Sequence, residues 1–214
     1  MRKIILSLML VLSVVLASCS DCGNTKQQEE ENINVTEEQQ IETLVLENTI
    51  SSDREYMFLN YGGDYRWFES SLKTTEFLDE DCQGNISEVT NIFQVVTEVG
   101  SGYDTHVIMI THTLDTSWVD VYNSFWVEDW PLNNEEIALT FEDAFNRIQE
   151  ADCPKPHSKC CVLRCEVGPN PTNAQYIFGN RRAQLYVDAV TGDVSESDPV
   201  FPDASFNGPL GEWP

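Results

Sequence analysis

The sequence predicts an α+β fold in which an antiparallel sheet packs against one main amphipathic helix. Three observations lead to this prediction. Residues 41–131 are rich in β-branched and aromatic residues that alternate with polar ones, which is typical of strands. Residues 141–151 place their apolar side chains at helical spacing instead. Further alternating segments follow within residues 161–189, and the short polar links between strands favour antiparallel pairing.

The N-terminal segment is typical of an exported lipoprotein. Two basic residues precede an apolar run over residues 4–15, and residues 16–19 read LASC. This order indicates a secretory signal, and LASC resembles a bacterial lipobox, in which the cysteine is lipidated and becomes the new N-terminus. We therefore expect residues 1–18 to be a lipoprotein signal peptide and Cys19 to carry the lipid. The alternative is an ordinary signal peptide followed by a chance cysteine.

The lipobox resemblance implies a location. We expect the lipid to anchor the protein in the Gram-negative cell envelope, at the outer membrane in preference to the inner one. The sequence leaves open which face of that membrane the protein occupies. No segment after the leader approaches the roughly 18 apolar residues that a membrane-spanning helix needs.

The charge of the chain limits its partners. It has 36 acidic and 12 basic residues and a formal net charge of −24. A nucleic-acid-binding protein needs a basic patch to neutralise phosphates, so we expect no nucleic-acid partner. The same charge repels anionic lipid, so the lipid anchor rather than electrostatics must hold the protein at the membrane.

The region before the helix divides into a tether and a strand-rich part. Residues 19–40 are polar and acidic and should form a flexible tether, because they have too little apolar surface to bury to offset the conformational entropy lost on ordering. Within residues 41–131 we expect a short helix over residues 56–61, capped by Ser52 or Asp53. The strands expected in this part cover residues 67–74, 86–99, 106–114 and 118–130.

The clearest helix starts at Phe141. Thr140 is a good N-cap, and Asp143 completes a variant capping box three residues later. We expect the helix to end near Ala151, before the prolines that follow. The strands expected after it cover residues 161–167, 175–178 and 183–189, and residues 196–214 should form a loosely ordered tail.

This C-terminal part resembles a PepSY-type module. Residues 187–194, VDAVTGDV, are similar to the V-D-A-x-T-G-x-V hairpin of that family, and residues 140–144, TFEDA, resemble its helix start. The resemblance covers roughly residues 135–195. It implies an envelope or secreted module that binds or restrains peptidases or other partners rather than catalysing a reaction. We assign residues 132–195 to this module and leave open that residues 41–131 are a second, divergent copy.

Thiols are concentrated between Cys153 and Cys165. Cysteine and histidine ligands suit zinc or copper, but the segment has no C-x-x-C pair. Cys161 and Cys165 would stand about 13 Å apart on a strand, too far for one metal or one disulfide. We expect these two to be buried apolar residues, and a disulfide between Cys153 and Cys160 can clasp a loop. We predict no metal and no cofactor here.

An acidic segment that begins at Asp79 resembles the first half of an EF-hand calcium loop. Asp79 and Asp81 occupy the first and third positions, Gly84 the sixth and Asn85 the seventh. Thr90 stands at the twelfth position, where a bidentate glutamate belongs. Asp79, Asp81 and Asn85 are thus candidates for a weak calcium loop. The alternative is an acidic turn in which Gly84 takes a positive φ.

The sequence offers no recognisable catalytic motif. G-x-S-x-G, H-E-x-x-H, Walker A and dinucleotide fingerprints do not occur. His106 and His112 face the same side of one expected strand, but no glutamate, cysteine or serine joins them at a telling spacing. We expect both to be structural histidines, and we assign no catalytic residue.

Aromatic residues alternate along the strand expected at 118–130. Trp118, Tyr122 and Trp126 share one face. On an exposed sheet face they could anchor a protein partner, whereas the interpretation that we favour is a core buried on both sides.

These observations predict a lipid-anchored, non-catalytic envelope protein that binds or inhibits an unknown protein or peptide. The alternative is a thiol- or metal-dependent envelope enzyme that uses the Cys153–Cys165 region. A single reactive thiol of low pKa would favour the enzyme, and paired or inert thiols would favour the binding module.

Overall fold

A computed structural model gives the arrangement of the chain after its N-terminal segment. It describes residues 43–99, 102–126, 130–166, 172–180 and 182–196. These residues belong to one compact unit. The expected signal peptide, Cys19, the tether and nearly all of the C-terminal tail lie outside the described residues.

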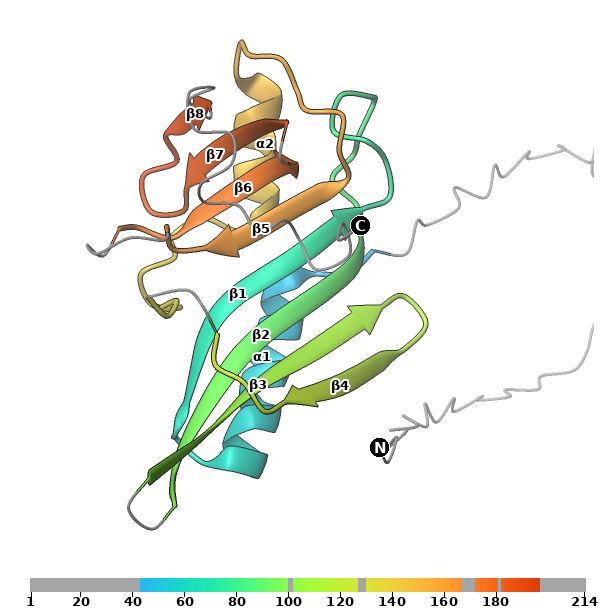
Figure 1. The fold of residues 1–214 in the computed structure, drawn as a ribbon. Coiled ribbons are helices and arrows are strands. Elements are labelled where there is room, and N and C mark those ends of the chain that lie inside the picture. The colour runs from blue at the N-terminus through green and yellow to red at the C-terminus, as the bar shows by residue number, and fades with distance from the viewer. Residues whose placement is uncertain (1–42, 100–101, 127–129, 167–171, 181, 197–214) are drawn as a thin grey trace, which may run out of the picture. The chain divides into compact units, whose positions relative to one another are not determined.

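The described residues form one antiparallel sheet and two helices (Figure 1). The first half of the unit contains α1 (Leu46–Tyr61), β1 (Tyr65–Thr74), β2 (Ile86–Val99), β3 (Gly102–Thr113) and β4 (Ser117–Tyr122). The second half contains α2 (Phe141–Glu150), β5 (Cys160–Arg164), β6 (Gln175–Asn180), β7 (Ala183–Asp188) and β8 (Val194–Glu196). This architecture confirms the α+β class.

The two halves meet at the centre of the sheet. The strand order is β4-β3-β2-β1-β5-β6-β7-β8, so each half runs outward from the β1–β5 pair. In that pair Leu72 lies opposite Cys161. Each half therefore has the same order of one helix followed by four strands, and β4 and β8 are the two edges of the sheet.

Both helices cover the same face of the sheet, which lies in front of them in Figure 1. Leu46 and Met57 of α1 belong to the same hydrophobic cluster as Phe141 and Ile148 of α2. A carboxylate oxygen of Glu47 accepts a hydrogen bond from the Phe141 amide at 2.9 Å, which joins the starts of the two helices. The halves thus share one continuous core.

Helix α2 confirms its predicted start. The Thr140 hydroxyl accepts a hydrogen bond from the Asp143 amide at 3.1 Å, and the Asp143 carboxylate accepts one from the Thr140 amide at 3.2 Å. This reciprocal pair satisfies two of the amides that the first turn would leave unbonded. The buried side of α2 consists of Phe141, Ala144, Phe145 and Ile148.

Helix α1 corrects the prediction of a short helix over residues 56–61. It starts ten residues earlier, at Leu46, so Ser52 and Asp53 lie inside it rather than at its cap. Two of its buried residues, Thr49 and Asp53, are polar. They interrupt the apolar stripe by which an amphipathic helix is recognised, so the sequence pattern does not indicate the full length of this helix.

Candidate functional site

Strand β4 forms an exposed edge of the sheet. Among the described strands it pairs only with β3, and all six of its residues are exposed. Trp118 and Tyr122 lie on the face away from the helices and are 42% and 48% exposed. Val119 and Val121 lie on the helix face, opposite core residues of β3, yet helix α1 packs on β1 and β2. The expectation that this strand is buried on both sides is therefore wrong.

The strand is also shorter than predicted. The alternation predicts a strand to residue 130, but β4 ends at Tyr122, and the Ser124 amide then donates to the Tyr122 carbonyl at 3.0 Å. Trp126 leaves the strand, and its amide donates to the side-chain oxygen of Gln94 on β2 at 2.8 Å. Trp118 and Tyr122 thus share a strand face, and Trp126 does not belong to that strand. Phe125, just before it, is 70% exposed.

Every second residue of β4 has its backbone amide and carbonyl groups unpaired with any described strand. Next to the turn, the Thr113 amide donates to the Thr116 carbonyl at 2.8 Å. Antiparallel strands alternate between bonded and non-bonded residue pairs, so Ser117, Val119 and Val121 direct their amide and carbonyl groups away from β3. The opposite edge is different, because β8 has only three residues, and Ser195 and Glu196 there are exposed and polar.

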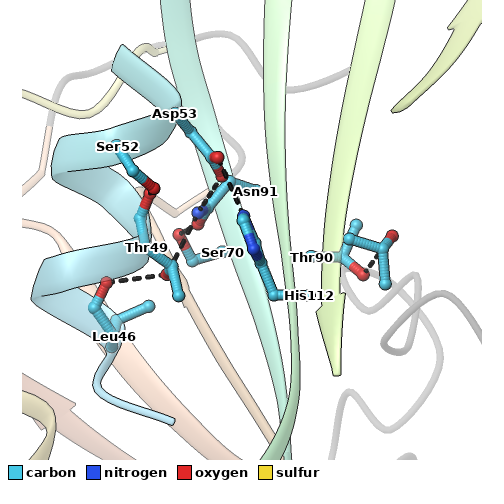
Figure 2. A network of polar contacts seen from close by, with 9 residues as sticks. Leu46, Thr49, Ser52, Asp53, Ser70, Thr90, Asn91 and His112 are labelled. Atoms are coloured by element: carbon cyan, nitrogen blue, oxygen red, sulfur yellow. Dashed lines mark hydrogen bonds and ion pairs between the residues drawn. The ribbon is translucent and has the colours of Figure 1, made fainter. Parts of the chain in front are cut away.

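A buried polar network lies next to β4, between α1 and strands β1 to β3 of the sheet (Figure 2). Asp53 on α1 contacts the His112 ring on β3 at 2.8 Å and accepts a hydrogen bond from the Asn91 side-chain amide on β2 at 2.7 Å. The same Asn91 accepts a hydrogen bond from the Ser70 hydroxyl on β1 and donates to Thr49 at 3.3 Å. The network ties α1 to three neighbouring strands.

The sequence predicted only part of this arrangement. His112 and His106 both have hydrogen-bond partners, which agrees with the expected structural role; His106 contacts Asn123 and Asp104 at 3.0 Å each. The roles of Asp53 and Asn91 were missed. The available signal was Asn91 itself, a polar residue within the β-branched run of β2, which the structure shows to be fully buried.

The predicted calcium loop forms a turn that is tied to a neighbouring segment. Gly84 has φ of 73°, which agrees with the acidic-turn interpretation. A carboxylate oxygen of Asp79 contacts the His157 ring at 2.9 Å, and that ring stacks on Phe77 with centroids 4.1 Å apart. Asp81 is exposed and Asn85 is half-buried.

Metal ligands are not gathered in the part of the chain that the structure describes. There, no group of three or more His, Cys, Asp or Glu side chains could hold a metal ion. The weak calcium loop therefore stays a prediction, without support from this geometry.

The cysteines of the second half are mostly buried. Cys161 and Cys165 belong to the hydrophobic core, as predicted. Burial raises the pKa of Cys161 well above its ordinary value, and burial also raises the pKa of Cys165 and Cys82. Cys153 carries a free thiol in the structure, so the disulfide between Cys153 and Cys160 is not formed in it and stays a prediction.

We expect Cys161 and Cys165 to resist alkylation in the folded protein, because the reactive thiolate is disfavoured and reagent cannot reach a buried sulfur. Iodoacetamide labelling followed by peptide mass spectrometry should modify half-buried Cys153 before the buried cysteines. The same reaction in urea provides the control, in which all of these thiols should react. Fast labelling of Cys161 in the native protein would contradict the burial and favour the thiol enzyme.

The hairpin that resembles PepSY is a tightly bonded turn. One Asp188 carboxylate oxygen accepts hydrogen bonds from the Val190 and Thr191 amides, each at 2.8 Å, and the other accepts one from Asn173 at 2.9 Å. Gly192 has φ of 78°, which favours glycine. Burial alone would raise the pKa of Asp188, but the bonds from Thr191, Asn173 and Val190 together lower it. Asp188 therefore has a structural role.

We expect Asp188→Asn to lower the free energy of unfolding at neutral pH. The folded protein depresses the pKa of Asp188, so this residue stabilises the fold above its unfolded pKa, and the contribution is lost as pH falls through the folded pKa. The difference between variant and wild type in urea denaturation should therefore shrink in acid. Asp115→Asn, in the exposed β3–β4 turn, is the control and should show no such trend.

An open cavity of about 360 Å³ lies beside α1 and the start of β1. Arg54 and Arg66 line it together with Tyr65 and the exposed ring of Phe58. Both arginines are exposed to solvent, and the indole nitrogen of buried Trp67 in the lining already donates to the Glu69 carbonyl at 3.0 Å. The edge at β4 is the stronger candidate for a binding site.

Comparison with known protein families, with curated proteins and with solved structures finds no match for this chain.

Among the described residues, no helix is both long enough and apolar enough to cross a membrane.

Proposed function

We propose that this protein is a lipid-anchored, non-catalytic protein of the Gram-negative cell envelope that binds a protein or peptide partner through β4. The exposed edge strand carries the proposal. Large apolar side chains on an unpaired sheet edge are an aggregation hazard, and proteins normally avoid them unless they serve binding. Trp118 and Tyr122 belong to the residue types that contribute most to binding energy.

Two further features support a binding role. The buried cysteines of the core are poor nucleophiles, which weakens the alternative of a thiol enzyme. The repeated order of one helix and four strands agrees with the proposal that the chain contains two PepSY-like copies, because that family is expected to pack a helix on a small antiparallel sheet.

Photo-crosslinking in cells tests the binding role. A photoreactive amino acid at Tyr122 should give an adduct with a partner protein, because this side chain lies on the proposed surface. The matched control is the same amino acid at Ser195, which is exposed on the opposite edge. Equal adducts at both positions, or none at Tyr122, would contradict the proposed site.

The proposed lipid anchor at Cys19 leads to a separate prediction. Cys19→Ala should release the protein from the membrane fraction, because the lipobox resemblance makes this thiol the site of lipidation. Fractionation with metabolic labelling by a radioactive fatty acid measures both effects. Replacement of Cys22 by alanine is the control and should leave the protein membrane-bound. Retention of the Cys19 variant, with no label on the wild type, would contradict the anchor.

A further inference from the structure

We propose that β4 binds an extended segment of the partner that carries lysine or arginine, and that this segment adds to the sheet as a ninth strand. The inference rests on the proposed binding function and names the class of partner. Three properties of β4 lead to it: its unpaired backbone, its apolar side chains on both faces and its uncompensated negative charge.

The backbone of β4 is suited to strand addition. Ser117, Val119 and Val121 direct amide and carbonyl groups outward at every second residue, which is the spacing that an added strand requires. Six residues of extended chain span about 20 Å, enough for a strand of ordinary length. The opposite edge, β8, has half this length and lacks large apolar side chains on its exposed residues.

The side chains of β4 are suited to a segment that is apolar and cationic. Successive residues of an added strand would contact opposite faces of the sheet. On the helix face they would meet Val119 and Val121. On the other face they would meet Trp118, Asp120 and Tyr122, where the Trp118 ring nitrogen donates to the Asp120 carboxylate at 3.1 Å. A carboxylate flanked by two aromatic rings suits lysine and arginine, through both charge pairing and cation–π contact.

Nothing in the neighbouring sequence neutralises this surface. The chain has no lysine or arginine between Lys73 and Arg147, a stretch that includes β2, β3 and β4. Acidic Asp104 and Asp115 lie on β3 and in the β3–β4 turn. A cationic segment would therefore be attracted to this edge, with the strength of the attraction falling as salt is added.

The same charge disfavours a second copy of this chain as the occupant. Each copy carries a net charge of −24, and pairing β4 with itself would bring the Asp120 carboxylates of both copies into one short ladder. Like charges close together across a ladder are destabilising. Pairing between copies is accordingly an outcome that would overturn the proposal.

Two synthetic peptides test the proposal on the purified full-length mature protein. Both are about eight residues long, an ordinary strand length. One alternates valine with lysine, and the other alternates valine with glutamate. We expect only the lysine peptide to bind by isothermal titration, and we expect it to slow amide hydrogen exchange at Ser117, Val119 and Val121. Equal binding of the glutamate peptide would overturn the cationic preference.

Two variants separate the contributions. Val119→Pro removes an outward amide without removing a hydrogen bond to β3, and we expect it to weaken lysine-peptide binding about tenfold or more. Val119→Thr keeps the amide and should bind nearly as wild type. Asp120→Asn should weaken binding about threefold, as an exposed charge pair does. Unchanged binding by Val119→Pro would overturn strand addition.

The remaining outcomes are also decisive. A dimer in sedimentation that Val119→Pro dissolves would show that a second copy occupies the edge, and the proposal would be wrong. Failure of the lysine peptide to protect the β4 amides would overturn it too. If the Tyr122 crosslink in cells persists in that case, the proposed binding function stands and only the partner class fails.

Discussion

Replacing Phe178 with alanine is expected to lower the free energy of unfolding by about 3–5 kcal/mol. Phe178 on β6 is fully buried, and its ring lies 5.9 Å from that of Phe141 and 6.4 Å from those of Phe145 and Tyr176, measured between centroids. Alanine would leave a cavity among three rings that the rigid α2–sheet contact cannot close, so both the transfer free energy and the cavity term are lost.

Urea denaturation measures this loss, followed in parallel by circular dichroism and tryptophan fluorescence. Because β1 pairs with β5 and one cluster fills the core of both halves, we expect the two signals to change together. Val96→Ala, at a position exposed on β2, is the control and should change stability by no more than about 0.5 kcal/mol. Separate transitions for the two signals would show that the halves are independent domains.

The sequence predicted the second half better than the first, and the reason is local. Helix α2 can be predicted from local sequence, because it has a capping box and four buried apolar residues at helical spacing. Helix α1 has no side-chain cap at Val45, and its buried side includes Thr49 and Asp53. Thr49 donates to the Leu46 carbonyl within its own helix at 2.8 Å, but Asp53 is compatible with burial because Asn91 and His112, far away in sequence, satisfy it. A local pattern contains no information on such partners.

The exposure of β4 depends on a long-range property as well. Alternation correctly predicted strands over most of the first half, but it could not predict that β1 pairs with β5. That pairing puts β4 at the edge of the sheet, beyond the reach of α1. The sequence pattern of β4, with valines on one face and aromatic residues on the other, is typical of a strand buried on both faces. In the structure both faces of β4 are exposed.

The second large effect is expected at Asn91. Asn91→Asp keeps the shape of the side chain but replaces the donor that faces Asp53 at 2.7 Å with an acceptor. The introduced carboxylate would then face the buried Asp53 carboxylate, which would keep its contact with His112 but lose its donor from position 91. We expect the free energy of unfolding to fall by about 3–5 kcal/mol, the usual effect of breaking a buried polar pair and leaving a charge uncompensated.

The pH dependence of this variant distinguishes the proposed contact from a general packing defect. The carboxyl group introduced at position 91 would face the Asp53 carboxylate, so it should bind a proton more tightly in the folded variant than in the unfolded chain. Its deficit relative to wild type should therefore shrink as pH falls, since the proton restores a hydrogen bond between positions 91 and 53. Urea denaturation between about pH 8 and pH 5 measures this trend. The control is exposed Asn146→Asp, which should lose little stability at any pH. A deficit for Asn91→Asp that is equal at every pH would show that Asn91 and Asp53 are not in contact.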